Sequence, residues 1–292
     1  MSYNRHSFHL HSPRTYSLNC RGKLLQLRQP VVMGILNVSP ESFYDGGKFI
    51  EENSILEKAS ELVSNGAQII DIGGASSRPG ATIIPFEEER QRLIPAIKLV
   101  SAHFPSVFIS ADTWRARLAD EAIHAGAHII NDISGGELDK EMFNTVARLK
   151  VPYILMHMKG IPENMQNDPV YLDVMEELLF YFQKKIYALR QAGVQDIIAD
   201  PGFGFGKSVA DNYRILAYIE LLHQLDCPVL AGFSRKSMIN KVLGTSPETA
   251  LNGTSVLNTI ALMNGVQILR VHDAKEALEC IKIVEAFQAQ QS

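Results

Sequence analysis

The chain has 292 residues, an apolar fraction of 46% and a formal net charge of −4. This composition is typical of a soluble α/β protein with one domain, and the slightly acidic balance excludes a nucleic-acid-binding footprint. No apolar run approaches the roughly 18 residues of a membrane span and no signal peptide opens the chain, so we expect a cytoplasmic protein without a membrane partner. Cys20, Cys227 and Cys280 match no zinc spacing, which favours free thiols in a reducing compartment.

Residues 1–28 form a polar extension that precedes the first aliphatic run. The pair Arg21-Gly22 predicts a hairpin turn, and such a hairpin would close the floor of the domain formed by residues 29–292. His6, His9 and His11 alternate in this extension. A metal site there is a minor alternative, because no other ligand type converges on these histidines.

Four segments share one pattern, in which a glycine is followed by a small residue, a polar residue and branched aliphatic residues. They are residues 66–71, 126–131, 193–200 and 265–270. Glycine just after a periodic stretch ends a helix, and the aliphatic run is typical of a strand buried on both faces. Four further runs begin near a proline and alternate with the first four along the chain. They are residues 30–36, 105–111, 152–156 and 228–232.

The two series together predict eight strands with helical patterns between them. Eight βα units over roughly 250 residues is the size of a (β/α)8 TIM barrel, so we expect a single α/β domain of this class. Among the helices, residues 171–192 predict an amphipathic helix with Leu172 on its buried face, and Ser54 to Glu57 predicts a capping box that opens an earlier helix. A polar or charged residue follows each strand, where such barrels place active sites, which indicates an enzyme.

The loops after the first two strands are rich in glycine and small polar residues. Residues 37–47 end in a diglycine, and residues 73–80 contain one arginine, Arg78. Two such loops at the mouth of a barrel predict lids that close on substrate. Ordinary surface loops are the alternative that composition alone favours.

The segment after the sixth strand begins with Asp200 and continues with three glycines that alternate with Phe203 and Phe205. Exposed phenylalanine is unfavourable in water, so glycine-hinged phenylalanines at a barrel mouth predict a planar ligand that covers them. The following Gly-Lys-Ser lacks the upstream glycine of a phosphate-binding P-loop.

Two cation-rich segments follow the last two strands. Residues 234–237 are Ser-Arg-Lys-Ser, and Arg270 and His272 are two residues apart, so they point the same way along an extended chain. A guanidinium and an imidazole near these loops of a TIM barrel predict a phosphate site. A histidine satisfied within the barrel top is the alternative for His272.

The strand ends also supply two carboxylates and an amide, from Asp112, Asn131 and Asp200. Buried carboxylates without partners are unfavourable, so the group predicts a ligand with several N–H donors. The 2-amino and N3–H edge of a pterin matches a carboxylate in this way. A guanine or a diaminopyrimidine also fits these residues.

From about Val31 to the C-terminal helix, the chain resembles the dihydropteroate synthase family, the pterin-binding barrels of folate biosynthesis. The phrases that carry the resemblance are MGILNVSPESFYDGG, IDIGGASSRPGA, AHIINDISGG, LMHMKG, DPGFGFGK, GFSRKS and RVHD. The resemblance implies a transferase that condenses 4-aminobenzoate with (7,8-dihydropterin-6-yl)methyl diphosphate, releases pyrophosphate, uses Mg²⁺ and is a sulfonamide target.

The resemblance also implies a role for each matching residue. The pterin would be held by Asp112, Asn131, Asp200 and Lys236. The diphosphate would be held by Arg270, His272 and Arg78, and Mg²⁺ by Asn37. The aminobenzoate would be framed by Ser77, Arg78, Pro79, Phe205 and Ser237.

The chain departs from the usual family pattern at a few positions. Ser39 and Ser77 stand where threonine is common, Glu41 where aspartate is common, and Trp114 where a smaller residue is frequent. The serines keep a hydroxyl group, so we expect activity to persist. The sequence leaves open which groups the longer Glu41 carboxylate contacts.

Two other functions are compatible with a pterin barrel. A methyltetrahydrofolate-dependent methyltransferase would share the Asp/Asn pocket but would need neither Asn37 nor the pair Arg270 and His272. A catalytically silent pterin-binding module would show erosion at those residues or in the two loops. Apolar residues on the last helix, Ile283, Val284 and Phe287, favour a homodimer.

Overall fold

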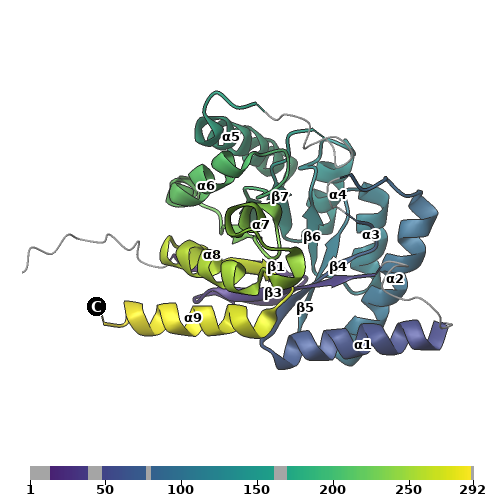
Figure 1. Cartoon of the computed structure of the whole chain (residues 1–292). Coiled ribbons are helices and arrows are strands. Elements are labelled where there is room, and N and C mark those ends of the chain that lie inside the picture. The colour runs from purple at the N-terminus through teal and green to yellow at the C-terminus, as the bar shows by residue number, and fades with distance from the viewer. Residues whose placement is uncertain (1–13, 39–47, 77–79, 161–169, 291–292) are drawn as a thin grey trace, which may run out of the picture.

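The structure is a computed structural model that describes residues 14–38, 48–76, 80–160 and 170–290 (Figure 1). Eight parallel strands form one sheet in the order β8-β7-β6-β5-β4-β3-β10-β9. They are β3 (Val31–Asn37), β4 (Ala67–Gly73), β5 (Phe108–Asp112), β6 (Ile129–Asp132), β7 (Tyr153–Met156), β8 (Ile197–Asp200), β9 (Leu230–Ala231) and β10 (Ile268–Val271). A parallel bridge between Ala199 and Val229 joins the two outer strands of this order. The sheet therefore curls into a nearly closed barrel, and the predicted TIM barrel is confirmed.

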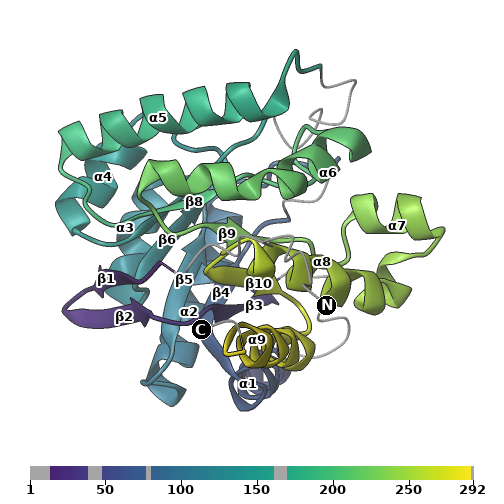
Figure 2. The same cartoon turned by 90° about the vertical axis from the view of Figure 1, so that its left-hand side faces the viewer.

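Helices alternate with the strands and cover the outside of the barrel, as the two views show (Figures 1 and 2). The α-helices are α1 (Lys48–Ser64), α2 (Phe86–His103), α3 (Ala116–Ala125), α4 (Met142–Leu149), α5 (Val174–Ala192), α6 (Val209–Ala217), α7 (Ser237–Leu243), α8 (Leu251–Met263) and α9 (Ala274–Gln288). The 3₁₀-helices are η2 (Ile219–Leu225) and η3 (Pro247–Thr249). No helix in these described ranges is long and apolar enough to cross a membrane.

The glycine-led segments lie where the sequence places them. Gly66, Gly126, Gly193 and Gly265 each follow a helix and have φ values of 92°, 122°, 99° and 82°. Residues with side chains rarely adopt this region, which is why glycine recurs at the point where each helix turns back into a strand.

Two predictions about helices are wrong in detail. The capping box at Ser54 does not open a helix, because α1 already begins at Lys48. Leu172 does not lie on the buried face of α5: it precedes the helix, which is capped by the Asp173 carboxylate, and its side chain is fully exposed. A residue before the cap does not follow the helical period.

The N-terminal hairpin is confirmed. Strands β1 (Tyr16–Cys20) and β2 (Lys23–Leu27) pair antiparallel, and the turn residues Arg21 and Gly22 have φ values of 57° and 86°. Figure 2 shows this hairpin at one end of the barrel. The buried hairpin side chains form one apolar cluster with the barrel interior, namely Leu18, Cys20, Leu25, Leu27, Val31, Met33, Ile69, Ile129, Ile154, Ile198, Leu230 and Ile268. The hairpin therefore closes the floor of the barrel.

Candidate active site

A largely buried ion-pair cluster lies within the barrel, toward the carboxyl ends of its strands. Arg270 of β10 extends to Asp71 of β4, with its Nε 2.7 Å and its Nη2 2.6 Å from Asp71 Oδ2. The same Nη2 donates to Asp112 Oδ2 at 2.8 Å. One guanidinium thus bridges two carboxylates from strands that are distant in the sequence.

Asn131 of β6 completes this cluster. Its Nδ2 donates to Asp71 Oδ2 at 3.1 Å, and both side chains are buried. Within the described part of the chain, Asp71 Oδ1 is buried without a hydrogen-bond partner. A buried oxygen of this kind is unfavourable by about 1–3 kcal/mol or more unless a ligand or a water satisfies it. The cluster is therefore prepared to accept an N–H or O–H donor.

Charge and burial shift the pKa values of this cluster. Burial and the neighbouring Asp71 carboxylate raise the pKa of Asp112 above its usual range, while Arg270 opposes the shift. Burial acts to lower the pKa of Arg270, but Asp71 and Asp112 outweigh it and raise that pKa. Arg270 therefore stays a cation, and burial disfavours the charged form of Asp112.

Two further charged side chains are Asp200, which ends β8, and Lys236, which follows β9. The Asp200 carboxylate is buried and accepts the Gly202 N–H at 2.8 Å. Burial raises its pKa, and Lys236 is the first of the groups that oppose the rise. The Lys236 ammonium donates to the Phe203 carbonyl oxygen and lies 4.7 Å from the centre of the Phe205 ring. Burial lowers the pKa of Lys236 to about 8.

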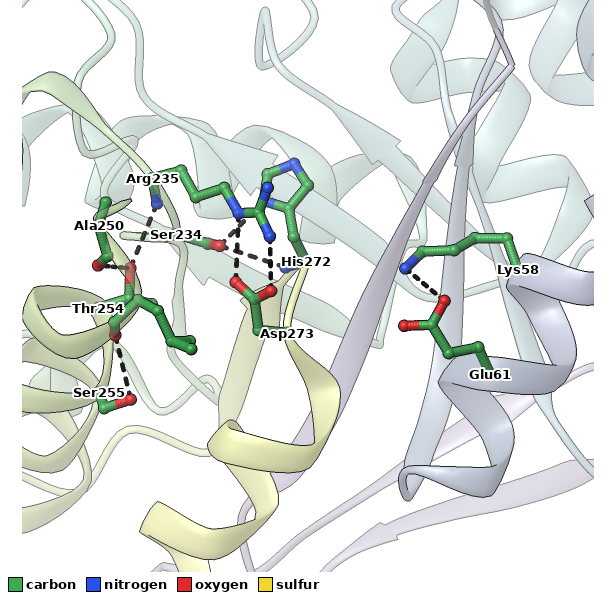
Figure 3. Close-up of polar contacts among 10 residues, drawn as sticks. Lys58, Glu61, Ser234, Arg235, Ala250, Thr254, Ser255, His272 and Asp273 are labelled. Atoms are coloured by element: carbon green, nitrogen blue, oxygen red, sulfur yellow. Dashed lines mark hydrogen bonds and ion pairs between the residues drawn. The ribbon is translucent and has the colours of Figure 1, made fainter. Parts of the chain in front are cut away.

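At the end of β10, His272 is held by Ser234 from the end of β9. Ser234 Oγ is 2.9 Å from His272 Nδ1 and accepts the His272 backbone N–H at 3.2 Å (Figure 3). Arg235 and Asp273 form a two-point ion pair beside them, with distances of 3.2 and 2.6 Å. Ser234 thus fixes the orientation of the imidazole ring.

Comparison with known proteins places this arrangement in a family. The chain matches the family model of pterin binding enzymes over residues 33–272. It is 42% identical over 271 residues to the dihydropteroate synthase of Escherichia coli K12, covering 92% of this chain and 95% of that protein. It is 41% identical over 259 residues to the dihydropteroate synthase of Bacillus subtilis, covering 88% of each.

Solved structures agree with these relatives. The Yersinia pestis dihydropteroate synthase in complex with a sulfonamide drug superimposes with a TM-score of 0.88 at 42% identity, covering 94% of this chain and all of that one. The Xanthomonas albilineans dihydropteroate synthase with 4-aminobenzoic acid superimposes with a TM-score of 0.88 at 39% identity, covering 94% and 99%. The chain belongs to the dihydropteroate synthase family. This confirms the sequence resemblance and sets the methyltransferase alternative aside.

The structure brings most residues implied by the family together at the carboxyl ends of the strands. Asp112, Asn131 and Arg270 share one cluster, and Asp200, Lys236 and Phe205 form a second. Asn37 ends β3 beside Gly73, where an added Cβ would lie 3.5 Å from Asn37 Oδ1 and 3.6 Å from Asp112 Oδ2.

Other implied residues lie at the rim or outside the described residues. Ser237 is exposed at the start of α7. Ser77, Arg78 and Pro79 lie outside the described residues, as do His6, His9, His11, Ser39 and Glu41. Trp114 is half-buried beside the cluster of Ile133, Met156 and Phe205, with the Arg115 guanidinium 4.3 Å from its ring centre.

The expectation of exposed phenylalanines is wrong. Phe203 is fully buried and packs on Phe233 with 4.4 Å between ring centres, and Phe205 is 8% exposed. The alternating glycines have positive φ, which lets the segment fold back onto the barrel instead of hinging outward. Phe205 still lies beside Lys236, so its implied place near the aminobenzoate stands as a proposal.

Sequence reasoning missed two buried charges of the site, Asp71 and Lys207. Asp71 occupies the same place in its glycine-led segment as Asn131 and Arg270 do in theirs, so the repeat itself carried the signal. Lys207 is buried, and its ammonium donates to backbone carbonyl groups around Asp200.

Proposed function

We infer that the protein condenses 4-aminobenzoate with (7,8-dihydropterin-6-yl)methyl diphosphate to give 7,8-dihydropteroate and pyrophosphate. Membership of the family supports the reaction as a whole. The observation in this molecule that carries the inference is the acceptor set of Asp71, Asn131, Asp112 and Asp200 at the place where a TIM barrel binds substrate; all but the partly exposed Asp112 are buried. A ligand with several N–H donors satisfies this set.

The pterin would lie between the two clusters. Asp112 and Asn131 would contact it from one side, and Asp200 and Lys236 from the other. A carboxylate that receives two parallel N–H bonds matches the 2-amino and N3–H edge. Arg270 holds Asp112 from behind, so the guanidinium orients the carboxylate that meets the pterin.

The chemistry requires stabilisation of the leaving group more than activation of the nucleophile. An aromatic amine is neutral and nucleophilic near pH 7, so no strong general base is needed. Departure of pyrophosphate leaves positive charge on the methyl carbon, which the electron-rich dihydropterin delocalises. His272, held by Ser234, and Arg270 would take up negative charge on the departing oxygens.

We propose that Mg²⁺ binds with the diphosphate at Asn37. The amide oxygen of Asn37 and a carboxylate oxygen of Asp112 flank Gly73, and oxygen donors of this kind suit Mg²⁺. The described residues contain no cluster of three or more His, Cys, Asp or Glu side chains that could hold a metal. This fits an ion held by one or two protein groups together with substrate phosphates, and the ion would neutralise the leaving group.

The reaction is tested by incubating the purified protein with the pterin diphosphate and 4-aminobenzoate and measuring pyrophosphate release. We expect release with Mg²⁺ and its loss after chelation, restored by added Mg²⁺. Asn37→Ala should raise the Mg²⁺ concentration needed for half-maximal rate. Full activity in chelator would contradict the metal proposal, and release without dihydropteroate formation would contradict the condensation.

We also propose a cytoplasmic homodimer. Exposed apolar side chains gather on the last three helices, namely Val242, Leu243, Leu251, Val256, Ile260, Ile283 and Phe287. Val284, one of the residues on which the sequence prediction rested, is buried within the chain and cannot contribute. Sedimentation of the protein should give the mass of two chains, and the variant Val256→Asp, Ile260→Asp should give that of one. A monomeric wild-type protein would contradict the proposal.

A further inference from the structure

Lys207 ends the glycine–phenylalanine segment, and its ammonium is surrounded by acceptors. It lies 3.0 Å from His157 Nδ1, 3.2 Å from the His157 carbonyl oxygen, and 3.0 Å from the carbonyl oxygens of both Gly202 and Phe205. The residue is 3% exposed. Four acceptors around three ammonium protons leave no capacity for a substrate, so Lys207 acts on the site through other residues.

These contacts join two segments that both border the site. Gly202 and Phe205 belong to the segment that begins with Asp200, whereas His157 follows β7. The segments lie in direct backbone contact, because a Cβ added at Gly202 would lie 2.0 Å from the His157 carbonyl oxygen. A Cβ added at Gly206 would lie 2.2 Å from the Lys159 carbonyl oxygen. Lys207 therefore fastens the segment at the place where glycine allows the closest approach.

Other hydrogen bonds also hold residues 200–207 in place. Gly204 N–H donates to Asn212 Oδ1 at 2.7 Å, and the Tyr171 hydroxyl donates to the Gly206 carbonyl at 2.8 Å. The Phe203 carbonyl accepts from Lys236. A segment with three glycines would otherwise sample many conformations, and these bonds select one. Asp200 and Phe205 are the side chains whose positions depend on that selection.

Lys207 also balances charge beneath the pocket. Among the charged groups of the site, Asp71, Asp200 and Lys207 are buried, whereas Asp112, Lys236 and Arg270 are partly exposed. Burial lowers the pKa of Lys207 to about 7, so its cationic form is favoured below that pH. Lys236, Arg270 and Lys207 all face Asp200 and favour its charged form. Without Lys207, Asp200 would keep Lys236 and Arg270 as neighbouring cations, and Arg270 also forms ion pairs with Asp71 and Asp112.

We propose that Lys207 is a positioning residue for the condensation. Its ammonium holds residues 200–207 against the segment after β7, and it thereby places Asp200 for the pterin and Phe205 for the aminobenzoate. The proposal rests on the function proposed above.

The test compares three substitutions at Lys207 with a matched lysine elsewhere. Lys207→Met removes charge and donors, Lys207→Gln keeps donors without charge, and Lys207→Arg keeps the charge. Lys185→Met is the control: that side chain is 15% exposed on α5 and pairs with Glu137, and its ammonium lies over the rings of Phe143 and Tyr181. Binding of a 6-hydroxymethylpterin is measured by calorimetry on folded protein between about pH 5 and 9, and kcat and KM are measured in parallel.

We expect Lys207→Met to weaken pterin binding by about 10- to 100-fold, on the scale of hydrogen bonds to charged groups. Because Lys207 favours ionised Asp200, both Met and Gln should move the loss of binding at low pH to a higher pH, and Arg should move it less. Gln should recover part of the affinity that Met loses. Lys185→Met should change neither affinity nor its pH dependence.

Two results would overturn the proposal. One is pterin affinity and pH dependence in Lys207→Met that match those of Lys185→Met. The other is that both Met and Gln variants fail to fold, while Arg folds with wild-type binding at every pH, because Lys207 would then be a structural fastening alone. Calorimetry does not depend on pyrophosphate release, so a wild-type protein that binds pterin without turnover would count against the proposed reaction and not against this role.

Discussion

The two ends of the barrel interior differ in polarity: one end carries charged side chains and the other carries apolar ones. At the carboxyl ends of the strands, Asp71, Asp112 and Arg270 form a largely buried ion-pair cluster with Asn131. At the amino ends, the interior is an apolar cluster that the hairpin β1–β2 completes. Both sets of side chains come from the same short strands. Along each strand, the residues of the charged site therefore lie only a few positions from residues of the apolar core.

The difference teaches where stability comes from in this enzyme. Removing apolar surface from water is favourable by about 25 cal/mol per Å², whereas buried ion pairs often gain little over apolar packing of the same shape. The floor of the barrel therefore stabilises the fold, and the mouth maintains a charged arrangement that binding requires. Substitutions at the two ends should separate these contributions.

The largest effect is expected from Arg270→Met, which leaves Asp71 and Asp112 without their cation. Breaking one partner of a buried ion pair typically lowers the free energy of unfolding by about 3–5 kcal/mol. Loss of a charge-stabilising group should also lower kcat by about 10²–10³. Urea unfolding and steady-state assays measure both.

The control for Arg270→Met is Arg214→Met, which breaks the exposed ion pair with Asp173. An exposed pair of this kind contributes about 0–1 kcal/mol, so stability and kcat should hardly change. An Arg270 variant that was as stable as the Arg214 variant would show that the cluster does not depend on its guanidinium.

At the other end, Leu25→Ala should lower stability and spare catalysis. Leu25 is 2% exposed within the apolar cluster, and truncation of a buried leucine typically lowers the free energy of unfolding by about 2–5 kcal/mol. Leu24→Ala is a matched control, because Leu24 precedes Leu25 in the same strand and is 60% exposed. A large fall in kcat per folded Leu25→Ala molecule would mean that the floor influences the mouth.

Sequence patterns predicted the barrel well because its determinants are local. The recurring glycines mark the same turn four times, and the aliphatic runs need only be buried. The strand ends then placed Asp112, Asn131 and Asp200 in one region. Topology alone brings those residues together, so no detail of side-chain geometry was required.

What the patterns missed depends on three-dimensional contacts. The sequence shows Arg270 two residues from His272, but its role as the bridge between two carboxylates arises across strands far apart in the chain. The burial of Phe203 likewise depends on Phe233, from another strand end. Arg270, which the family resemblance assigns to the diphosphate, also donates to Asp112, so we expect its substitution to weaken binding of the plain pterin as well.

The mouth should also respond to pH in a way that the floor does not. Because the pKa of Asp112 is raised in the folded state, this carboxyl stabilises the fold fully below its ordinary pKa, and the stabilisation is lost as pH rises through the folded value. Asp112→Asn should therefore show a smaller fall in stability than the wild type between about pH 5 and 8. Asp200 has the same direction of shift and leaves some dependence in place. Parallel curves for the two proteins in urea unfolding would contradict the raised pKa.

The smallest effect is expected from Ser234→Ala, which tests how finely the mouth is arranged. Ser234 Oγ contacts both Nδ1 and the backbone N–H of His272, and its loss removes one contact that orients the ring. A hydrogen bond of this kind contributes about 0.5–1.5 kcal/mol, so the affinity for the pterin diphosphate should fall by roughly 2- to 12-fold. Binding of 6-hydroxymethylpterin, which lacks the diphosphate, should stay at the wild-type level. Calorimetry with both ligands distinguishes the outcomes, and His272→Ala should give a larger loss confined to the same ligand. Equal weakening of both ligands by Ser234→Ala would assign the Ser234–His272 pair to the pterin pocket, and the diphosphate role of His272 would then be wrong.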